Sequence, residues 1–377
     1  MKKISLAGAG LSVLCGLAHA QSSVSLYGVV DSAVTFVSNS GGRHDVSMQS
    51  PIPNRWGLKG SEDLGGGLRA VFQLENGFSV ANGSAGQGGL LFGRQAFVGL
   101  SDAQWGTLTA GRQYDVIADY LEPLTMNGGW GADFSHGGDI DNTDDAYRVN
   151  NAVKYASPSY HGLRASAMYA FGGVPGEFGA NSMYALGLAW SRGSLSVASV
   201  YEYAKNPATQ FAEAPFKANV PTGPAISAVG AGQFALVGHP SDSRIIGGGA
   251  SYAIGPGTVG VNYTNTRFGH ANGTGSAVVF DNYELWGSCK LTAAATLIAG
   301  YTLTDARIDY ATRYRSPKWH QFNLMADYAL SKRTDVYLMG IYDHAAGGAT
   351  ASIYAGTTGV STSANQALLG VGLRTRF

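Results

Sequence analysis

Eight carboxylates and no lysine or arginine occupy residues 114–147, the densest group of candidate functional side chains in the sequence. An acidic segment of this kind commonly faces water as a solvated surface loop. This one is also long and contains an aromatic, glycine-rich run from Gly128 to Phe134, so it can pack inside a larger structure and present charge there. The eight carboxylates are Asp115, Asp119, Glu122, Asp133, Asp139, Asp141, Asp144 and Asp145.

The last four aspartates of this segment could bind calcium, because four carboxylates within seven residues supply hard oxygen ligands. Their spacing lacks the turn glycine of an EF-hand. The eight histidines are scattered, with no pair at ligand spacing, which gives zinc or copper little support. We therefore expect no cofactor and no metal site, with structural calcium at Asp139, Asp141, Asp144 and Asp145 as the alternative.

Neighbouring serines and histidines raise the question of a hydrolase site. Ser135 lies beside His136, and Ser159 lies near His161. A serine needs an activating base and a positioned turn to act as a nucleophile, and no nucleophile elbow accompanies either pair. The sequence therefore does not indicate an enzyme.

The elements that must position these residues are strands with one apolar and one polar face. Residues 24–36 and 369–377 both alternate with the two-residue period of a β-strand. An apolar outer face around a polar inner face is typical of a transmembrane barrel. The apolar parity comprises Val24, Leu26, Val30, Val34 and Phe36 in the first strand, and Leu369, Val371, Leu373 and Phe377 in the last.

Sixteen strands are expected along the chain, an even number that suits a closed antiparallel barrel. Short links, as at residues 62–67 and 255–257, alternate with long ones near 38–45, 80–90, 114–147, 205–242, 268–279, 304–317 and 344–364. Short turns on one rim and long loops on the other are the bacterial outer-membrane arrangement. We expect the strands near 23–37, 46–61, 68–79, 91–101, 106–113, 148–158, 163–171, 182–191, 194–204, 243–254, 257–267, 280–290, 295–303, 318–328, 335–343 and 365–377.

Composition and the N-terminal segment agree with export to a membrane. Residues 1–20 read as a cleavable signal peptide, with Lys2 and Lys3 ahead of an apolar stretch and Ala18-His19-Ala20 at the cleavage site. The remainder, 21–377, carries 23 basic against 25 acidic residues, which argues against nucleic acid as a partner. It contains no run of about 18 apolar residues, so an exported membrane protein of this sequence must cross as a closed barrel.

Aromatic residues lie near many strand ends, where they could form girdles at the two membrane interfaces. They include Tyr160, Tyr201, Tyr263, Tyr283, Trp286 and Tyr301.

Over essentially its whole mature length the sequence resembles the general porins of Gram-negative bacteria, in particular those of beta-proteobacteria. The resemblance rests on three segments and on the terminal Phe377. The segments are Ser25-Leu26-Tyr27-Gly28-Val29-Val30-Asp31, Asn54-Arg55-Trp56-Gly57-Leu58-Lys59-Gly60-Ser61-Glu62-Asp63-Leu64-Gly65-Gly66-Gly67-Leu68 and Gly93-Arg94-Gln95-Ala96-Phe97-Val98-Gly99-Leu100.

The resemblance implies an all-β homotrimer of 16-stranded antiparallel transmembrane barrels, each narrowed by a third long loop that folds inward. It implies a basic wall at the constriction, which maps onto Arg55, Arg94 and Arg148, with Lys59 on the parity of Arg55. The facing acidic loop would supply Asp133, Asp139, Asp141, Asp144 and Asp145. The Pro-Glu-Phe-Gly signature of enterobacterial porins is absent, and residues 127–130 read Asn-Gly-Gly-Trp in roughly its place. Phe377 would be part of the signal read by the outer-membrane assembly machinery.

These observations predict passive diffusion of ions and small hydrophilic solutes across the bacterial outer membrane, with membrane lipid around the barrel. Opposite charges across a narrow waist order water and penalise apolar solutes, which is the chemistry that such a pore needs. A substrate- or anion-selective pore is the alternative, and a plugged barrel acting as an adhesin or structural protein is the alternative of another class. Residues 205–242, poor in charge, are expected to be an external loop that tolerates deletion.

Overall fold

The structure, a computed structural model, describes residues 23–211, 232–309 and 316–377. The expected signal peptide, residues 1–20, lies outside the described residues. Seventeen strand segments account for most of the described chain. They are β1 (Ser23–Ser40), β2 (Arg43–Gln49), β3 (Arg55–Gly65), β4 (Leu68–Gly77), β5 (Gln95–Asp102), β6 (Gly106–Gln113), β7 (Val149–Ala156), β8 (Leu163–Ala170), β9 (Met183–Arg192), β10 (Leu195–Lys205), β11 (Asp242–Ile254), β12 (Gly257–Gly269), β13 (Val278–Lys290), β14 (Ala295–Ile308), β15 (Lys318–Ala329), β16 (Thr334–Ala346) and β17 (Asn365–Arg376).

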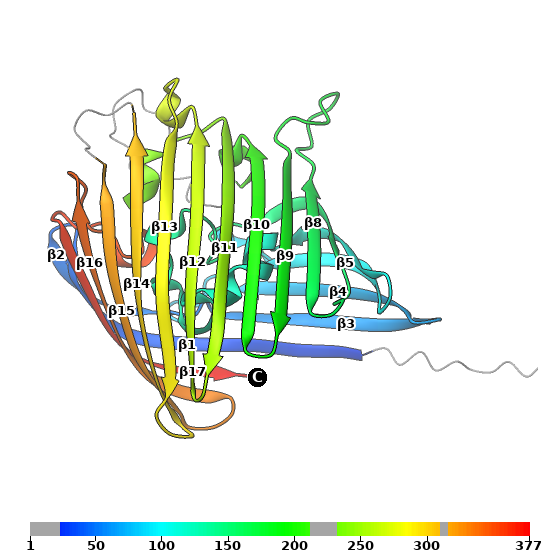
Figure 1. The fold of residues 1–377 in the computed structure, drawn as a ribbon, viewed down its shortest axis with the longest axis horizontal. Helices are drawn as coiled ribbons and strands as arrows, with labels where there is room; N and C mark the ends of the chain where they lie inside the picture. Colours follow the sequence, from blue (N-terminus) through cyan, green and yellow to red (C-terminus); the bar gives the residue numbers. More distant parts are fainter. Residues whose placement is uncertain (1–22, 212–231, 310–315) are drawn as a thin grey trace, which may run out of the picture.

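The strands form one closed antiparallel barrel. From β3 to β17 each strand pairs with the next, and β17 pairs with β1 to close the ring. In Figure 1 the strands at the front run steeply, whereas β1, β3 and β4 behind them run nearly across the view. This crossing reflects the tilt that strands need to close a barrel.

The expected strand 46–61 is interrupted between β2 and β3. Both segments pair with the same side of β1, so together they occupy one position and the wall has sixteen strands. The gap contains Pro51 and Pro53, which lack the N–H that a ladder needs. Side chains take over locally: Asp31 accepts from the Ile52 N–H at 2.6 Å, and Asn54 accepts from the Asp31 N–H at 2.5 Å.

The rims differ as the sequence indicates, with one exception. The hairpins β3–β4, β5–β6, β9–β10 and β11–β12 turn within a few residues at one rim, whereas most connections at the other rim are long. The expected long link at 38–45 is wrong: β1 and β2 meet in a two-residue turn. Gly41 and Gly42 both have positive φ, of 61° and 91°, which is the backbone that tight hairpins require.

The barrel presents an apolar face outward. On β17, Leu369, Val371 and Leu373 expose between 50% and 61% of their surface, while Leu368 and Arg374 point inward and are buried. The same parity holds on β1, where Val24, Leu26, Val34 and Phe36 are exposed. The predicted two-faced strands are therefore confirmed.

Exposed tyrosines lie on the outer face of the barrel. Tyr263 and Tyr283 are direct cross-strand neighbours, with ring centroids 5.1 Å apart, and both are exposed. Trp286 was expected with them but points inward, where its Nε1 donates to the Leu124 carbonyl at 2.8 Å.

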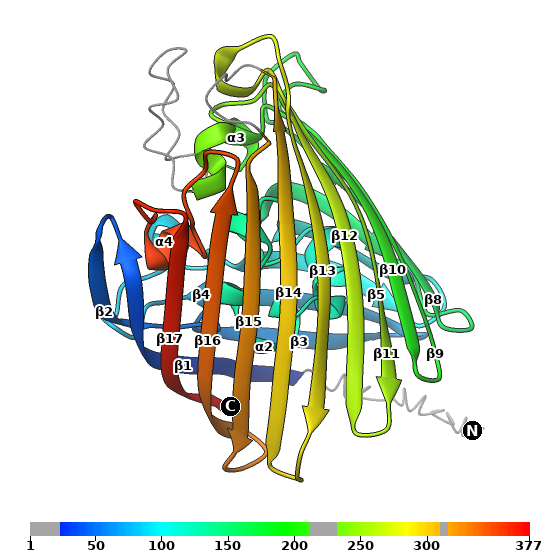
Figure 2. The same cartoon turned by 60° about the vertical axis from the view of Figure 1, so that its left-hand side comes forward.

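Residues 114–148, between β6 and β7, lie against the inside of the wall (Figure 2). They contain α1 (Val116–Tyr120), η2 (Glu122–Leu124), α2 (Asn127–Trp130), η3 (Ala132–Phe134) and η4 (Gly137–Asp139). Apolar side chains of α1, such as Ile117, pack against inward residues of β9–β11, including Val200 and Ile245. This buried cluster fills one side of the barrel. It also includes residues next to α3 (Pro207–Gln210) and in η6 (Gly232–Leu236), while η1 (Gln87–Gly89), η7 (Ala271–Gly273) and α4 (Ala355–Thr358) lie in other long connections.

Within the described ranges, no helix has the length and apolar character to cross a membrane.

Candidate functional site

The inner segment 114–148 is tied to the wall by hydrogen bonds from inward-facing side chains. The Leu124 carbonyl accepts from Asn262 Nδ2 at 2.7 Å as well as from Trp286. The Met126 N–H donates to Glu284 Oε1 at 3.0 Å. These groups lie on β12 and β13, so the middle of the segment is held against the barrel wall opposite β1.

Further along, a buried ion pair fixes the segment. His136 Nδ1 lies 2.6 Å from Asp141 Oδ2, and Asp141 also accepts from Thr264 and Asn282 on the wall. Burial opposes ionisation of both groups. The mutual attraction and hydrogen bond outweigh it, raising the pKa of His136 well above its usual value and lowering that of Asp141 to about 2. The pair is therefore charged at neutral pH. Because His136 is fully buried in this ion pair, it is not accessible as a base beside Ser135.

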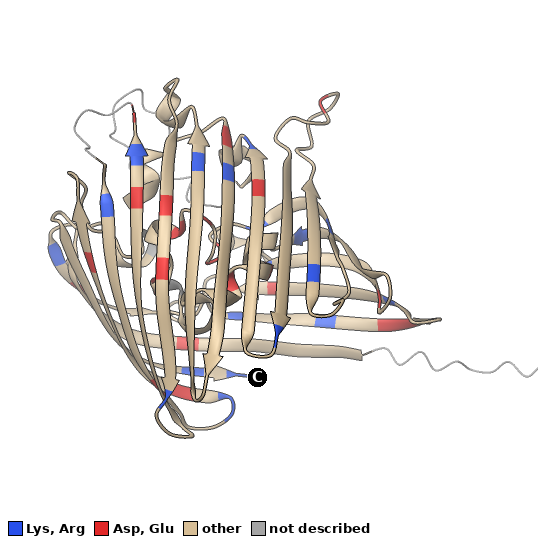
Figure 3. Cartoon of the chain, in the orientation of Figure 1, with Lys and Arg blue, Asp and Glu red and all other residues tan. Residues whose placement is uncertain are grey.

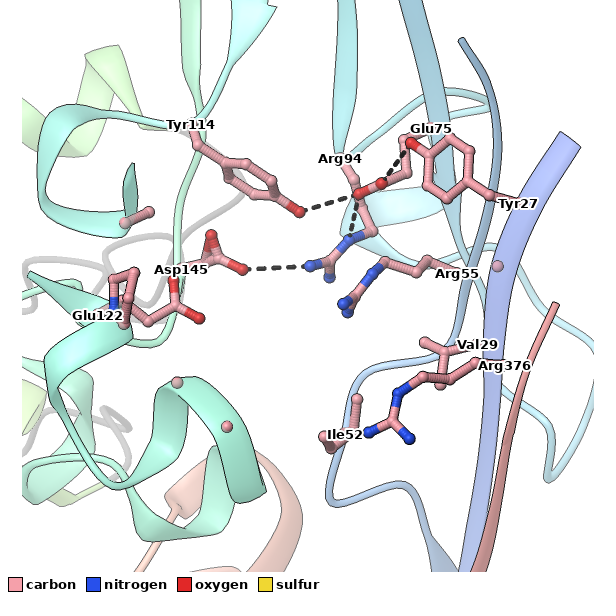
Figure 4. A pocket seen from close by; sticks show the side chains of 15 residues that line it. Tyr27, Val29, Ile52, Arg55, Glu75, Arg94, Tyr114, Glu122, Asp145 and Arg376 are labelled. Atoms are coloured by element: carbon pink, nitrogen blue, oxygen red, sulfur yellow. Dashed lines mark hydrogen bonds and ion pairs between the residues drawn. The ribbon is translucent and has the colours of Figure 1, made fainter. Parts of the chain in front are cut away.

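Between this segment and the opposite wall lies a cavity of about 620 Å³ (Figure 4). Three arginines and three carboxylates line it, together with two tyrosines. They come from β1, β3, β4, β17, the residues just before β5 and the inner segment. The charged and aromatic lining residues are Arg55, Arg94, Arg376, Glu75, Glu122, Asp145, Tyr27 and Tyr114.

Arg94 is the buried centre of this group, with 2% of its surface exposed. Its Nε donates to Glu75 Oε1 at 2.9 Å, and its Nη2 donates to Asp145 Oδ2 at 3.1 Å. Asp145 also accepts from Arg148 Nη2 at 3.3 Å. Both guanidinium groups lie over the ring of Tyr114, at 5.6 and 5.3 Å from its centroid. The charges of Glu75 and Asp145 are thus shared with Arg94 and Arg148.

Arg55 and Arg376 form fewer ion pairs with the described carboxylates than Arg94 does. In Figure 4 both guanidinium groups lie at the cavity, across from Glu122 and Asp145. Arg55 Nη1 donates to the Pro53 carbonyl at 3.2 Å, and no carboxylate among the described residues forms an ion pair with it. Arg376 is half exposed and pairs with Asp335 at 2.9 Å.

Five carboxylates of the inner segment, including Glu122 and Asp144, have a pKa above that of a free carboxyl group. Burial, followed by repulsion from Asp145 and Asp144, raises the pKa of Glu122 well above its usual value. Burial and the charge of Asp145 raise the pKa of Asp144 to about 8. At neutral pH the inner segment therefore carries less negative charge than its sequence suggests.

The predicted acidic residues separate in space. Asp145 reaches the cavity, whereas Asp139 folds the segment itself by accepting from the N–H groups of Asp144 and Ala146 at 2.8 and 2.9 Å. Asp133 lines a second cavity of about 440 Å³ near the long-loop rim. Asp144 is half buried and lies 3.4 Å from Asn127 Nδ2, and Asp141 is held at the wall as described above.

The predicted basic residues also differ in position. Arg55 and Arg94 line the main cavity, while Arg148 lies behind Asp145. Lys59 is exposed in another cavity of about 430 Å³, between the waist and the short turns, with its ammonium 5.2 Å from the ring of Tyr27.

Several residues that line the main cavity were not predicted from the sequence. Glu75 and Arg376 have the inward parity of β4 and β17, so strand alternation could have identified them. Tyr114 and Glu122 lie outside strands, and no periodic pattern places them at the cavity. Within the described parts of the chain, no group of three or more His, Cys, Asp or Glu side chains is arranged to hold a metal ion.

Comparison with known proteins places this architecture in a family. A family model described as Gram-negative porin matches residues 6–348. An outer membrane porin protein of Bordetella pertussis is 29% identical over 417 aligned residues, covering 100% of both chains. Outer membrane porin protein 32 of Delftia acidovorans is 30% identical, covering 89% of this chain and 88% of its own length.

A solved structure described as an anion-selective porin from Comamonas acidovorans superposes with a TM-score of 0.75 and 25% identity. It covers 95% of this chain and 100% of its own.

Proposed function

Because the chain belongs to the Gram-negative porin family and forms a passive pore in the outer membrane, we propose that its waist favours anions. The observation that carries this proposal is that positive charge exceeds negative charge around the main cavity. Arg55, Arg94 and Arg376 line the cavity, and Arg148 lies behind Asp145. Of the three lining carboxylates, Glu75 and Asp145 are already paired with arginines, and the raised pKa of Glu122 favours its neutral form. The anion selectivity stated for the Comamonas porin supports the same direction.

The mechanism requires no bound cofactor and no energy coupling. Guanidinium groups on one side and the carboxylates on the other set up a field across the cavity, which orders water and makes entry of an uncharged apolar solute costly. Entry costs small anions less free energy, since no described carboxylate forms an ion pair with the guanidinium of Arg55. The inner segment holds the opposite side of the waist in place through its buried contacts with β12 and β13.

The experiment is a recording from planar bilayers containing the purified, folded protein under a potassium chloride gradient. We expect ohmic current with a reversal potential that indicates preference for chloride. Arg55→Gln should reduce that preference. Arg69→Gln, which removes an exposed inward-facing arginine near the short turns, is the matched control and should change it less.

A reversal potential on the potassium side in the unmodified protein would contradict the proposed selectivity. Silent membranes despite a folded barrel would favour the alternative of a plugged, adhesive or structural barrel.

Assembly and processing complete the proposal. Residues 1–20 act as an export signal that is removed, and three barrels associate in the membrane, so channel insertions should occur in groups of three. Phe377 contributes to recognition by the assembly machinery. Its exposed ring and its position at the end of β17 support this role, because the residue closes the seam between the last strand and β1.

A further inference from the structure

We infer that the outer face of β15 and β16, near the long-loop rim, binds one divalent transition-metal ion through His320 and His344. These two side chains are named here the histidine pair. The pair lies on the outside of the wall, apart from the main cavity, so the inference does not rest on the proposed selectivity.

The strand register places the two histidines side by side. His320, the third residue of β15, is directly opposite His344 of β16, and their ring centroids lie 6.4 Å apart. Both share the outward parity of Phe322 and Tyr342, which are exposed and directly opposite each other. The two histidines are far apart in the sequence, so no ligand spacing along the chain indicates them.

The distance between the rings suits a shared ion. With metal–nitrogen bonds of about 2.0–2.1 Å, two imidazole rings on one ion have centroids about 5–6.5 Å apart. The observed separation of 6.4 Å lies at the upper end of this range. The rings therefore need little movement to reach one ion.

Hydrogen bonds to the flanking strands turn the two rings toward each other. His320 Nδ1 lies 2.7 Å from the Tyr301 hydroxyl oxygen on β14, and His344 Nδ1 lies 2.8 Å from Asn365 Oδ1 on β17. The strands are ordered β14, β15, β16, β17, so each Nδ1 points away from the other histidine (Figure 2). In an imidazole ring the edge formed by Nε2 and Cδ2 lies opposite Nδ1. The Nε2 edges of the two rings therefore face each other across the strand pair.

The same contacts leave both Nε2 atoms able to bind a metal. An amide oxygen only accepts, so His344 Nδ1 carries the proton and Nε2 has a lone pair. The Tyr301 hydroxyl can accept from His320 Nδ1 in the same way. Within the described residues neither Nε2 forms a hydrogen bond or an ion pair. Histidines that ligate metals commonly donate their other N–H to an oxygen in this manner.

The charge around the pair does not oppose a cation. Lys318, two residues before His320, forms an ion pair with Asp305, which is directly opposite it on β14. Figure 3 shows this arrangement as a basic and an acidic position side by side near the upper ends of β15 and β14. The positive charge of the lysine is therefore compensated by its own neighbour.

The chemistry of the pair favours transition metals over calcium and magnesium. Imidazole nitrogens suit Zn²⁺, Cu²⁺ and Ni²⁺, whereas Mg²⁺ and Ca²⁺ prefer oxygen ligands. Two protein ligands leave the remaining coordination positions to water. The ion therefore exchanges with the surrounding solution, and a test of the site has to supply it.

The test measures Zn²⁺ binding by calorimetry to the purified, folded full-length protein, after alkylation of the exposed Cys289 thiol. We expect one ion per chain. His320→Gln and His344→Gln should each weaken the affinity by about tenfold or more, since loss of even an outer partner of a ligand typically has that effect. The double variant should lose little more, because one imidazole alone cannot chelate. His44→Gln, which removes an exposed outward histidine of β2 with no histidine opposite it, is the matched control and should leave the affinity unchanged.

Several outcomes would overturn the inference. They are failure of the unmodified protein to bind Zn²⁺, equal affinity for Mg²⁺ and Zn²⁺, and single variants that lose binding sites without losing affinity. The last result would show that the two histidines act independently. If a variant does not fold, electron paramagnetic resonance of the unmodified protein with less than one Cu²⁺ per chain decides the matter. A shared ion should show coupling to two ring nitrogens, and coupling to one would contradict the pair.

Discussion

The charge at the waist depends on which contacts each carboxylate of the inner segment makes. Asp115 accepts from the N–H groups of Ile117 and Ala118, at 2.8 and 2.9 Å, and so caps α1. Asp119 pairs with Lys154 at 2.5 Å. Eight acidic residues that look alike in the sequence therefore cap a helix, form ion pairs, fix the segment or line a cavity.

The raised pKa of Asp144 predicts that selectivity depends on pH. Below about pH 8 the carboxyl is mostly neutral, and above it the group adds a negative charge beside Asp145. Preference for chloride should therefore decrease as pH rises through about 8. Reversal potentials recorded between pH 6 and pH 10 measure this change, and Asp144→Asn should flatten it. An unchanged pH profile in that variant would assign the effect to another group.

At the scale of elements, the seam between β1 and β17 is sensitive to a single methyl group. The backbones of Gly28 and Phe377 exchange two hydrogen bonds of 3.1 Å. A Cβ atom at Gly28 would lie 2.5 Å from Phe377 Cζ and 2.7 Å from the Arg55 carbonyl oxygen. The last residue of the chain can therefore pack here only against glycine.

We expect Gly28→Ala to destabilise the barrel by about 1–3 kcal/mol, the usual cost of overpacking. Thermal unfolding in detergent measures the loss. Gly287→Ala is the control, since its nearest neighbour would be 3.5 Å away.

Phe377→Ala should relieve part of the strain in the Gly28→Ala protein. If the Phe377→Ala substitution lowers the amount of protein in the outer membrane of cells but does not impair folding in detergent, Phe377 acts in assembly and not only in the seam.

The connection between β10 and β11 is more than an external loop. The ring of Phe211 is fully buried and stacks on Tyr147 of the inner segment, with centroids 4.0 Å apart, and Phe234 joins the same cluster. Residues 212–231, in the middle of the stretch 205–242 that was expected to tolerate deletion, lie outside the described residues. Contrary to the sequence-based expectation, removal of all of 205–242 should impair folding.

A point substitution tests the same contact. Phe211→Ala should cost about 3–5 kcal/mol, because a large aromatic side chain leaves a cavity. Phe178→Ala, at an exposed position between β8 and β9, is the control. Equal unfolding temperatures for the two variants would show that the contact does not stabilise the barrel.

At the scale of the whole molecule, stability follows from closing the ring and filling one side of it. Every described strand except β2, which pairs with β1 alone, is paired on both edges, so the ring of the wall is closed. The inner segment then reduces the remaining lumen to a cavity bounded by β1, β3 and β4 on one side and by its own backbone on the other.

This arrangement predicts that the folded protein does not depend on calcium. The oxygens of Asp139 accept from backbone N–H groups, and those of Asp141 accept from wall side chains and the histidine, so neither aspartate is poised for a metal ion. Treatment with a chelator should leave the unfolding temperature and conductance unchanged. A loss that calcium chloride restores would support the structural-calcium alternative instead.

The sequence by itself determined the barrel and its rims. A strand period of two assigns residues to the inner and outer faces one by one, as Leu369 and Val371 show. The tight turn at Gly41 and Gly42 instead lies where a long link was expected. The strand count followed from the same pattern, although the break between β2 and β3 at Pro51 and Pro53 was not expected. Arg55 and Arg94 were accessible through a motif shared with a family.

Only the tertiary structure decided which charges meet. Inside the barrel, residues far apart in sequence are brought to one cavity, as with Glu75, Arg94 and Asp145, whose ion pairs span 19 and 51 positions. The inner segment is irregular, so no period predicts that Asp145 faces the cavity while Asp139 binds its own backbone. Charge compensation depends on distances of a few ångström and on burial, and both are properties of the closed barrel that a linear pattern does not contain.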